Sequence, residues 1–344
     1  FVEAAQLAEG LTTAKGKENE EARQMSISVG VIGAGVMGSD HARILQTETI
    51  GAHLAAVCDA DADRAGTLGA PVVSDPLALI NSDRIDAVVV ASPDATHADL
   101  VQACLRAGKP VLCEKPLASS VDEAQRIIDA ETRLGKRLVQ VGYMRRFDPA
   151  YQEMQAVSAS GAIGRAVLLH NSHRNAKAPD WFTGPMAITN SFVHEIDISR
   201  WLLGSEITSA QIVSGSQGDP LMITMLTDRD AIVSTEVFMN AAYGYHVHAE
   251  LVGQSGSVVM QQPVQTQLNR ALQHGHAWPE NWIPRFRMAY VRQMNAWIRS
   301  ISTRVAAGAS AWDGFIASAI AEKLAPEVSS GRRVSFDFGQ RPTI

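Results

Sequence analysis

A glycine pattern near the start of the chain limits its fold more than any other feature of the sequence. Gly33, Gly35 and Gly38 form Gly-x-Gly-x-x-Gly directly after the apolar run ISVGVI, and helical spacing of apolar residues follows in AGVMGSDHARILQ. The first glycine of such a motif allows a tight turn, the second lets a diphosphate approach the backbone, and the third permits close packing of helix and strand. The positive end of the helix favours the anion. The pattern predicts a dinucleotide site, with an ordinary tight turn as the alternative.

An acidic residue at the end of the next strand supports the dinucleotide. Asp59 closes HLAAVCD, 21 residues after Gly38, where a ribose-binding acid belongs. Its carboxylate would accept hydrogen bonds from the 2′- and 3′-hydroxyls and repel a 2′-phosphate, and Arg64 is the only nearby cation. NAD is therefore expected in preference to NADP. The cofactor contacts expected here are Gly33, Ala34, Gly35, Val36, Met37, Gly38, Asp59 and Ala60, with Ser92, Pro93 and His97 further along the chain.

The spacing of apolar residues divides the chain into two parts. From Met25 to Tyr143, short apolar runs such as IDAVVVAS, KPVLCE and RLVQVGY alternate with helical stretches, which is typical of βαβ units and a parallel sheet. After Arg146, the runs AVLLHNSHRN, SAQIVSGS, LMITMLTD, AIVSTEVFMN, YHVHAELVG and GSVVMQQ predict an antiparallel sheet, and helices close the chain. We therefore expect an α/β protein with domains at residues 25–143 and 144–344. Residues 1–24 begin without methionine and are expected to be an extension or artefact without function.

Composition excludes several classes of function. The net charge of −6 argues against nucleic acid and anionic membranes as partners. No apolar run reaches the ~18–20 residues that a membrane span requires. Cys58, Cys104 and Cys113 lie far apart, and the histidine pairs at 246–248 and 274–276 lack a third ligand, so neither disulfides nor a metal are expected. Reduced thiols and the lack of a signal peptide favour the cytoplasm.

Two further segments carry residues suited to proton transfer. KPVLCEKPLA places Glu114 and Lys115 at the carboxyl end of a strand, the edge where ligands bind in open α/β sheets. A surface lysine in a strand-to-helix turn is the alternative. TNSFVHEIDISRWLLG predicts a helix that starts at the cap-type residues 189–191 and stops at Gly204, with His194 and an aspartate three residues later on one face. A buried histidine that is satisfied by this aspartate is the alternative.

Several motifs occur together in a familiar order. GVIGAGVMGSDH, CEKPLA, GKRLVQVGYMRRFD, HRN, VHEIDISRWL, YGY and AWDGFIASA make the chain resemble the glucose–fructose oxidoreductase, inositol dehydrogenase and rhizopine-catabolism (Gfo/Idh/MocA) family from Met25 to about Ala325. The Met-Arg-Arg, His-Arg-Asn and Tyr-Gly-Tyr elements resemble its inositol 2-dehydrogenase branch most. The resemblance implies an N-terminal Rossmann NAD-binding domain and a C-terminal α/β domain, for substrate binding and oligomerisation, with a large open, mainly antiparallel sheet. It also implies a homotetramer, with the last residues packing back on the first domain.

The same resemblance assigns roles to individual residues. Lys115 matches the catalytic lysine, and His194 matches the active-site histidine, which would face the nicotinamide and the substrate rather than lie in a core. Asp197 would support His194 from one helical turn away. Contacts to substrate hydroxyls are expected from Arg145, His173, Asn175, Tyr245 and Tyr290, and contacts to the cofactor from Glu114 and Lys115.

Physical chemistry is consistent with these roles. Oxidising a secondary alcohol requires a base that titrates near the working pH, as imidazole does. A lysine beside a positively charged nicotinamide should have its pKa lowered, and it could then hydrogen-bond the alkoxide as it forms. His194 is therefore expected to be the general acid/base and Lys115 its electrostatic partner, with exchanged roles as the alternative.

One residue departs from the family pattern. Inositol enzymes commonly carry an aspartate four residues before the histidine, where this chain has Asn190. If the family's aspartate polarises the histidine, the neutral amide of Asn190 would slow catalysis. If the aspartate instead holds a substrate hydroxyl, Asn190 would change which polyol fits, and this second role is favoured. The expected function is NAD-dependent oxidation of a cyclic polyol, with myo-inositol first, at the 2-hydroxyl. The alternatives are another inositol isomer, an amino-cyclitol or a sugar as the substrate, and a nucleotide-binding sensor without catalysis.

Overall fold

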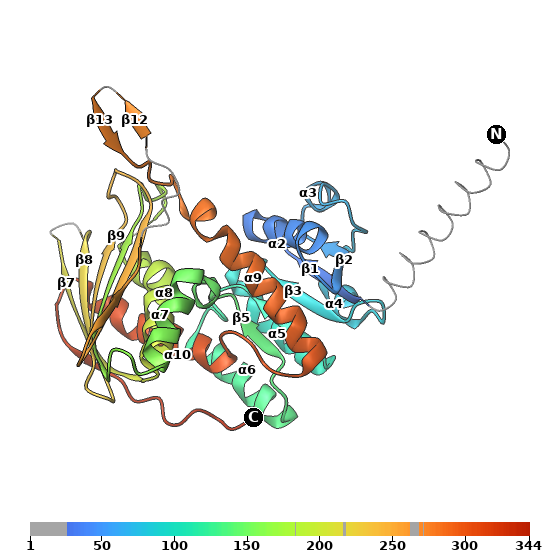
Figure 1. The fold of residues 1–344 in the computed structure, drawn as a ribbon. Coiled ribbons are helices and arrows are strands. Elements are labelled where there is room, and N and C mark those ends of the chain that lie inside the picture. Colours follow the sequence, from blue (N-terminus) through green and yellow to red (C-terminus); the bar gives the residue numbers. More distant parts are fainter. Residues whose placement is uncertain (1–25, 183, 216–217, 262–267, 271) are drawn as a thin grey trace.

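Two β-sheets with their flanking helices make up the protein (Figure 1). The computed structural model describes residues 26–182, 184–215, 218–261, 268–270 and 272–344. The expected extension at residues 1–24 lies outside the described residues.

The first sheet is parallel and has the strand order β2-β1-β3-β4-β5. Its strands are β1 (Ile27–Ile32), β2 (Ala52–Cys58), β3 (Ala87–Val90), β4 (Val111–Cys113) and β5 (Val139–Val141), and its helices are α2 (Val36–Thr47), α3 (Ala62–Gly66), α4 (Pro76–Asn81), α5 (His97–Arg106) and α6 (Val121–Leu134). All four residues of β3 are buried, as expected for a strand covered on both faces. The predicted parallel sheet is confirmed, and its order reverses between β1 and β3, where a ligand crevice belongs.

The second sheet has seven strands in the order β11-β10-β6-β9-β8-β7-β14. They are β6 (Ala166–Arg174), β7 (Ile207–Ser214), β8 (Leu221–Thr227), β9 (Ile232–Phe238), β10 (His246–Gly253), β11 (Ser257–Val259) and β14 (Val334–Ser335). The pair β6–β9 is parallel and the other described pairs are antiparallel, so the predicted, mainly antiparallel sheet is confirmed. Two features are not predicted from the sequence, namely β14 and a separate hairpin of β12 (Leu268–Arg270) and β13 (Gln273–Gly275).

The four remaining α-helices among the described residues are α7 (Pro149–Ala159), α8 (Val193–Leu203), α9 (Trp282–Thr303) and α10 (Ala311–Leu324). Of these, α7, α8 and α10 pack on the second sheet, and α9 packs on α2 beside the first sheet. α9 reaches the first sheet's helices, because Asn295 donates to the carbonyl oxygen of Glu48, just after α2, at 2.9 Å. α10 begins with a capping box of Ser310 and Asp313 and packs on both α6 and α8. These contacts hold the carboxyl edge of the parallel sheet against α8.

Candidate active site

The glycine turn has the geometry that its sequence predicts. Gly33 has φ +96°, and a Cβ built there would overlap the carbonyl oxygen of Ala91. A Cβ on Gly38 would overlap the carbonyl oxygen of Gly33, so this glycine permits the close approach of α2 to the turn. A Cβ on Gly35 would meet nothing within 4 Å, which leaves open space in front of the turn. No side chain caps the start of α2, so its first N–H groups are left for an anion.

Asp59 lies beside this turn and is fixed by backbone donors. Its carboxylate accepts hydrogen bonds from the amides of Ala34 at 2.5 Å and Asp61 at 2.8 Å, and it pairs with Arg64 at 2.6 Å. Burial favours the neutral acid, but these partners outweigh it and hold the pKa of Asp59 below its ordinary value. An ionised Asp59 next to an open, uncapped turn fits the adenosine ribose and diphosphate of NAD.

His97 joins the two loops that follow β3 and β4. Its Nε2 lies 2.8 Å from the carbonyl oxygen of Ser92, and its Nδ1 lies 2.6 Å from that of Pro116. Only an imidazolium donates to two carbonyl oxygens at once. Although burial opposes the charge, these partners and Cys113 raise the pKa of His97 to about 10. Both nitrogens are therefore used within the protein, so His97 fixes the two loops relative to each other, and the predicted contact of His97 with the cofactor stays a prediction.

Glu114 makes a similar link between elements. Its Oε1 lies 2.7 Å from Nε2 of His41 on α2, and its Oε2 accepts from the amide of Lys115 at 3.3 Å. The carboxylate therefore holds the end of β4 against α2, and both of its oxygens already have protein partners.

Lys115 is half-buried and reaches toward the other half of the molecule. Its ammonium donates to Oδ1 of Asn190 at 3.2 Å and to the carbonyl oxygen of Asn190 at 3.3 Å. This contact excludes the alternative of a surface lysine. Burial, reinforced by Arg145, lowers the pKa of Lys115, even though Glu114 and Asp94 favour the ammonium. The expected direction of the shift thus arises from desolvation within the protein itself.

His194 lies close to this ammonium in a backbone of unusual geometry. Residues Ala187–Phe192 form a π-helical turn that runs directly into α8, so the predicted helix start at residues 189–191 is wrong, whereas the predicted stop at Gly204 is confirmed by its left-handed backbone. π-helical turns occur frequently at functional sites. The imidazole is only 8% exposed, and thus more buried than expected, with the ring of Tyr143 edge-on at 5.8 Å.

Both ring nitrogens of His194 lack a hydrogen-bond partner among the described residues, and Nδ1 is buried. Leaving a buried polar atom unpaired costs about 1–3 kcal/mol, so native proteins rarely keep one without a reason. Burial, together with Arg145 and Lys115, holds the pKa of His194 well below its ordinary value. The histidine is therefore a neutral imidazole with free lone-pair capacity, and the alternative of a satisfied core histidine is excluded.

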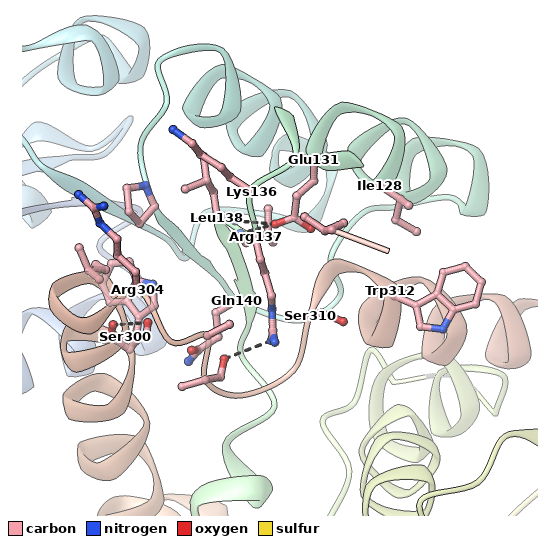
Figure 2. A pocket seen from close by; sticks show the side chains of 18 of the residues that line it. Ile128, Glu131, Lys136, Arg137, Leu138, Gln140, Ser300, Arg304, Ser310 and Trp312 are labelled. Carbon is pink, nitrogen blue, oxygen red and sulfur yellow. Dashed lines mark hydrogen bonds between the residues drawn. The ribbon is translucent and has the colours of Figure 1, made fainter. Parts of the chain in front are cut away.

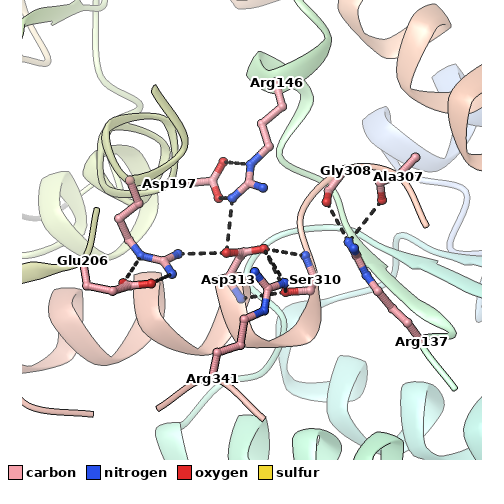
Figure 3. Close-up of polar contacts among 10 residues, drawn as sticks. Arg137, Arg146, Asp197, Glu206, Ala307, Gly308, Ser310, Asp313 and Arg341 are labelled. Atoms are coloured by element: carbon pink, nitrogen blue, oxygen red, sulfur yellow. Dashed lines mark hydrogen bonds and ion pairs between the residues drawn. The ribbon is translucent and has the colours of Figure 1, made fainter. Parts of the chain in front are cut away.

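The predicted support of His194 by Asp197 is wrong. Both carboxylate oxygens of Asp197 accept from Arg146, at 2.9 and 2.5 Å. Figure 3 shows that this pair continues to Asp313 on α10, whose Oδ1 lies 3.4 Å from Arg146. Arg200, also on α8, binds the same Oδ1 at 3.0 Å. Asp197 therefore belongs to a buried ion-pair network that fixes α8 to α10.

The predicted substrate contacts divide into two groups. Arg145 forms a buried ion pair with Glu195 and is 1% exposed, and Nδ1 of His173 lies 3.2 Å from the same carboxylate. Nε of Arg145 has no partner among the described residues, and the predicted contact of this guanidinium with a substrate hydroxyl stays a prediction. Its positive charge acts on the neighbouring His194 and Lys115.

The remaining three candidates stay predictions. The Tyr245 ring packs edge-on to His173 at 6.0 Å, and burial raises its pKa to about 12. Tyr290 on α9 packs edge-on to His41 at 5.9 Å. Oδ1 of Asn175 is buried without a partner among the described residues. Each keeps a polar group that could meet a hydroxyl.

Glu195 and Tyr143 lie beside the candidate site but are not predicted as site residues from the sequence. Glu195 is fully buried beside His194 and neutralises Arg145. The arginine at position 145 is a sequence signal for Glu195, because a buried arginine requires a carboxylate partner. No group of three or more potential metal ligands occurs among the described residues. None of the described helices has the length and hydropathy to cross a membrane.

The chain is similar to known proteins over most of its length. The family described as an oxidoreductase family with an NAD-binding Rossmann fold (Gfo/Idh/MocA) matches residues 27–143, and the Gfo/Idh/MocA C-terminal domain matches residues 151–259. Inositol 2-dehydrogenase 2 from Saccharopolyspora erythraea is 43% identical over 333 residues, which cover 93% of this chain and 98% of that protein. Inositol 2-dehydrogenase from Acidothermus cellulolyticus is 39% identical over 94% of this chain and 98% of its own length.

A solved structure is similar along nearly the whole chain. The myo-inositol dehydrogenase from Lactobacillus casei, determined with NAD(H) and myo-inositol, superposes with a TM-score of 0.89. It is 32% identical in sequence, and the match covers 93% of this chain and 99% of that one.

Proposed function

This chain belongs to the Gfo/Idh/MocA oxidoreductase family, and from that premise we propose that it oxidises myo-inositol at the 2-hydroxyl to the ketone, with NAD as the hydride acceptor. The observation that carries the proposal is the unpaired imidazole of His194, four residues after the Asn190 that binds the ammonium of Lys115. The relatives at 37–43% identity named inositol 2-dehydrogenase support the substrate.

The residues divide the chemistry between them. When bound, NAD removes a hydride from the carbon that carries the reacting hydroxyl. Neutral His194 accepts the hydroxyl proton on a ring nitrogen, because it has no competing partner. Lys115 donates a hydrogen bond to the oxygen as negative charge develops there, and its burial strengthens this interaction. Since the positive charges of Lys115 and Arg145 disfavour imidazolium, His194 readily passes its proton onward.

The cofactor would be held by groups along the carboxyl edge of the parallel sheet. The uncapped start of α2 receives the diphosphate, and Asp59 receives the adenosine ribose. The negative charge of Asp59 supports NAD over NADP, because it repels a 2′-phosphate. His97 keeps the loops of Ser92 and Lys115 at a fixed separation.

The position of Asn190 concerns the choice of substrate. Its amide oxygen binds Lys115, so it is placed beside the proposed alkoxide site and can influence which hydroxyl reaches that point. Another inositol isomer, an amino-cyclitol or a sugar remains the alternative substrate. A sensor without catalysis is disfavoured, because it has no need of both an unpaired imidazole and an ammonium with a lowered pKa.

A panel of substrates tests the proposal. Purified protein is mixed with NAD or NADP and with myo-inositol, other inositol isomers, an amino-cyclitol or simple sugars, and reduced cofactor is followed by absorbance. The highest kcat/KM is expected with myo-inositol and NAD. A higher kcat/KM with another polyol would identify that polyol as the substrate in place of myo-inositol. Tight binding of NAD, with no reduction of NAD by any substrate, would favour the sensor.

We also propose a cytoplasmic homo-oligomer, a tetramer by family resemblance. The outward face of the second sheet exposes apolar side chains, with Val213 on β7 opposite Met222 on β8, 67% and 46% exposed. Exposed apolar residues that are adjacent on a sheet suit a contact with a second copy. Three buried free cysteines suit a reducing compartment. Light scattering after size-exclusion chromatography tests the tetramer, and a monomer at micromolar concentration would contradict it.

A further inference from the structure

A cavity of about 800 Å³ lies at the edge of the parallel sheet opposite the candidate active site. Pro110 precedes β4, and Leu138 to Gln140 begin β5, so these strands approach the cavity with their amino ends. The end of α9, the following loop and the start of α10 form the other wall (Figure 2). Nothing in the proposed dehydrogenase reaction uses this space.

The walls of the cavity carry an excess of positive charge. Lys136, Arg137, Arg304 and Arg341 line it, against one acidic residue, Glu131. The carboxylate of Glu131 already accepts hydrogen bonds from the amides of Leu138 and Val139, at 2.7 and 2.8 Å. Burial raises the pKa of Glu131, which weakens its negative charge further. Of the four cationic side chains, only Arg341 has a carboxylate partner, Asp313 at 3.7 Å, among the described residues.

These cations have few protein partners of opposite charge. Arg137, Lys136 and Arg304 form no ion pair with any of the described residues. Arg137 donates only to the carbonyl oxygens of Ala307 and Gly308, at 3.2 and 2.7 Å. Burial lowers its pKa, although the negative charge of Asp313 opposes this shift. Because none of the described carboxylates pairs with it directly, this half-buried guanidinium keeps the capacity to bind an anion.

An unpaired amide gives an independent indication of a ligand. Gln140 is 3% exposed, yet neither Oε1 nor Nε2 has a hydrogen-bond partner in the described part of the chain. Gly308 packs against it with φ +68°, and a Cβ there would lie 2.9 Å from Cδ of Gln140. The indole Nε1 of Trp312, also in the lining, is likewise buried and unpaired. Buried donors and acceptors in one cavity are usually completed by a ligand or water.

We infer that this cavity binds a small organic phosphate, with the phosphate on the cationic side chains and polar groups of the organic part on Gln140 and Trp312. Arginine and lysine suit phosphate, because charge-assisted hydrogen bonds to it are stronger than those between neutral groups. A volume of about 800 Å³ is larger than inorganic phosphate requires, which favours a phosphorylated metabolite over free phosphate.

Calorimetry on the full chain tests this site with three probes, namely inorganic phosphate, glucose 6-phosphate and unphosphorylated glucose. Saturating NAD occupies the diphosphate turn, and constant ionic strength removes general salt effects. Glucose 6-phosphate is expected to bind more tightly than inorganic phosphate, and glucose is expected not to bind. If inorganic phosphate binds equally well, the site is confirmed as a phosphate site and its occupant is the free ion.

Variants decide whether the cavity is responsible. Lys136→Gln and Arg304→Gln remove exposed charges without protein partners and should each weaken glucose 6-phosphate binding by about tenfold or more. Gln140→Leu should weaken glucose 6-phosphate binding more than phosphate binding. Arg133→Gln on α6 and Arg299→Gln on α9 remove equally exposed charges outside the lining and should change nothing. Absence of binding by either phosphate, or equal losses in the cavity and control variants, would overturn the inference.

Discussion

Replacing Asn190 by aspartate would place a carboxylate oxygen at the position of an amide oxygen that lies 3.2 Å from the Lys115 ammonium. At this distance, Coulomb's law gives an attraction of about 1.3 kcal/mol for an effective dielectric constant of ~80, and about 5 kcal/mol for ~20. Since 1.36 kcal/mol corresponds to one pH unit, Asn190→Asp should raise the pKa of Lys115 by about one to four pH units.

The assay is the pH dependence of kcat/KM for myo-inositol. If the ammonium of Lys115 stabilises the forming alkoxide, activity is lost on the alkaline side when that ammonium loses its proton. In Asn190→Asp the alkaline limb should therefore move to higher pH. The acid limb should move the same way by a smaller amount, because the new carboxylate also favours the imidazolium of His194.

A neutral variant provides the matched control. Asn190→Ser changes the shape and the hydrogen bond but adds no charge, so its alkaline limb should stay within about one pH unit of the wild type. An Asn190→Asp enzyme that is folded and binds NAD normally, yet keeps the wild-type profile, would refute the view that Lys115 titrates as a catalytic group beside residue 190.

Three further predictions concern the cofactor half of the protein. Gly38→Ala should lower the melting temperature, because its Cβ would overlap the Gly33 carbonyl oxygen. Gly35→Ala should keep the wild-type melting temperature but bind NAD more weakly, because its Cβ enters open space. Equal melting temperatures of the two variants would contradict this reasoning. Asp59→Ala should weaken NAD binding by about 10–100-fold and NADP binding much less, as measured by titration of the fluorescence of the reduced nucleotides. An unchanged ratio of NAD to NADP affinity would exclude ribose recognition by this acid. The pKa of His97 is raised from 6.5 to about 10, so its stabilising effect should be complete below pH 6.5 and disappear as the pH rises toward 10. Urea unfolding of wild type and His97→Asn should therefore differ most at pH 6, and a difference that does not vary with pH would reject the imidazolium.

The features that the sequence predicted correctly are those specified by local pattern. The turn at Gly33 to Gly38 follows from steric demands within a few residues, and the parallel sheet follows from alternating apolar runs and helices. The stop of α8 at Gly204 depends only on the left-handed backbone that glycine tolerates.

The features that the sequence analysis missed depend on contacts between distant segments. Asp197 has the right helical spacing to support His194, but Arg146 and the network at Asp313 bind it instead, and neither partner is near it in the sequence. The start of the helix is displaced to residue 187 because the amides of Ile188 and Thr189 already bind the carbonyl oxygen of Pro185. Spacing along the chain identifies which side chains share a face, but it does not decide which partner reaches them.

The two-domain division at residues 143 and 144 also illustrates this limit. Apolar spacing assigns α9 to the second part of the chain, yet Arg287 on α9 pairs with Glu48 at 2.9 Å beside α2. Such a contact has no local signal, because it joins residues 239 positions apart.

The central claim is that His194 accepts the hydroxyl proton and Lys115 stabilises the alkoxide while inositol is oxidised by hydride transfer to NAD. It is tested most directly by NADH formation from myo-inositol and NAD in the wild type, Lys115→Met and His194→Gln, with NAD affinity measured on the same samples. We predict NADH from the wild type, at least ~10²-fold lower kcat in each variant, and unchanged NAD affinity in His194→Gln. A wild type that forms no NADH, or either variant with wild-type turnover, would contradict the claim.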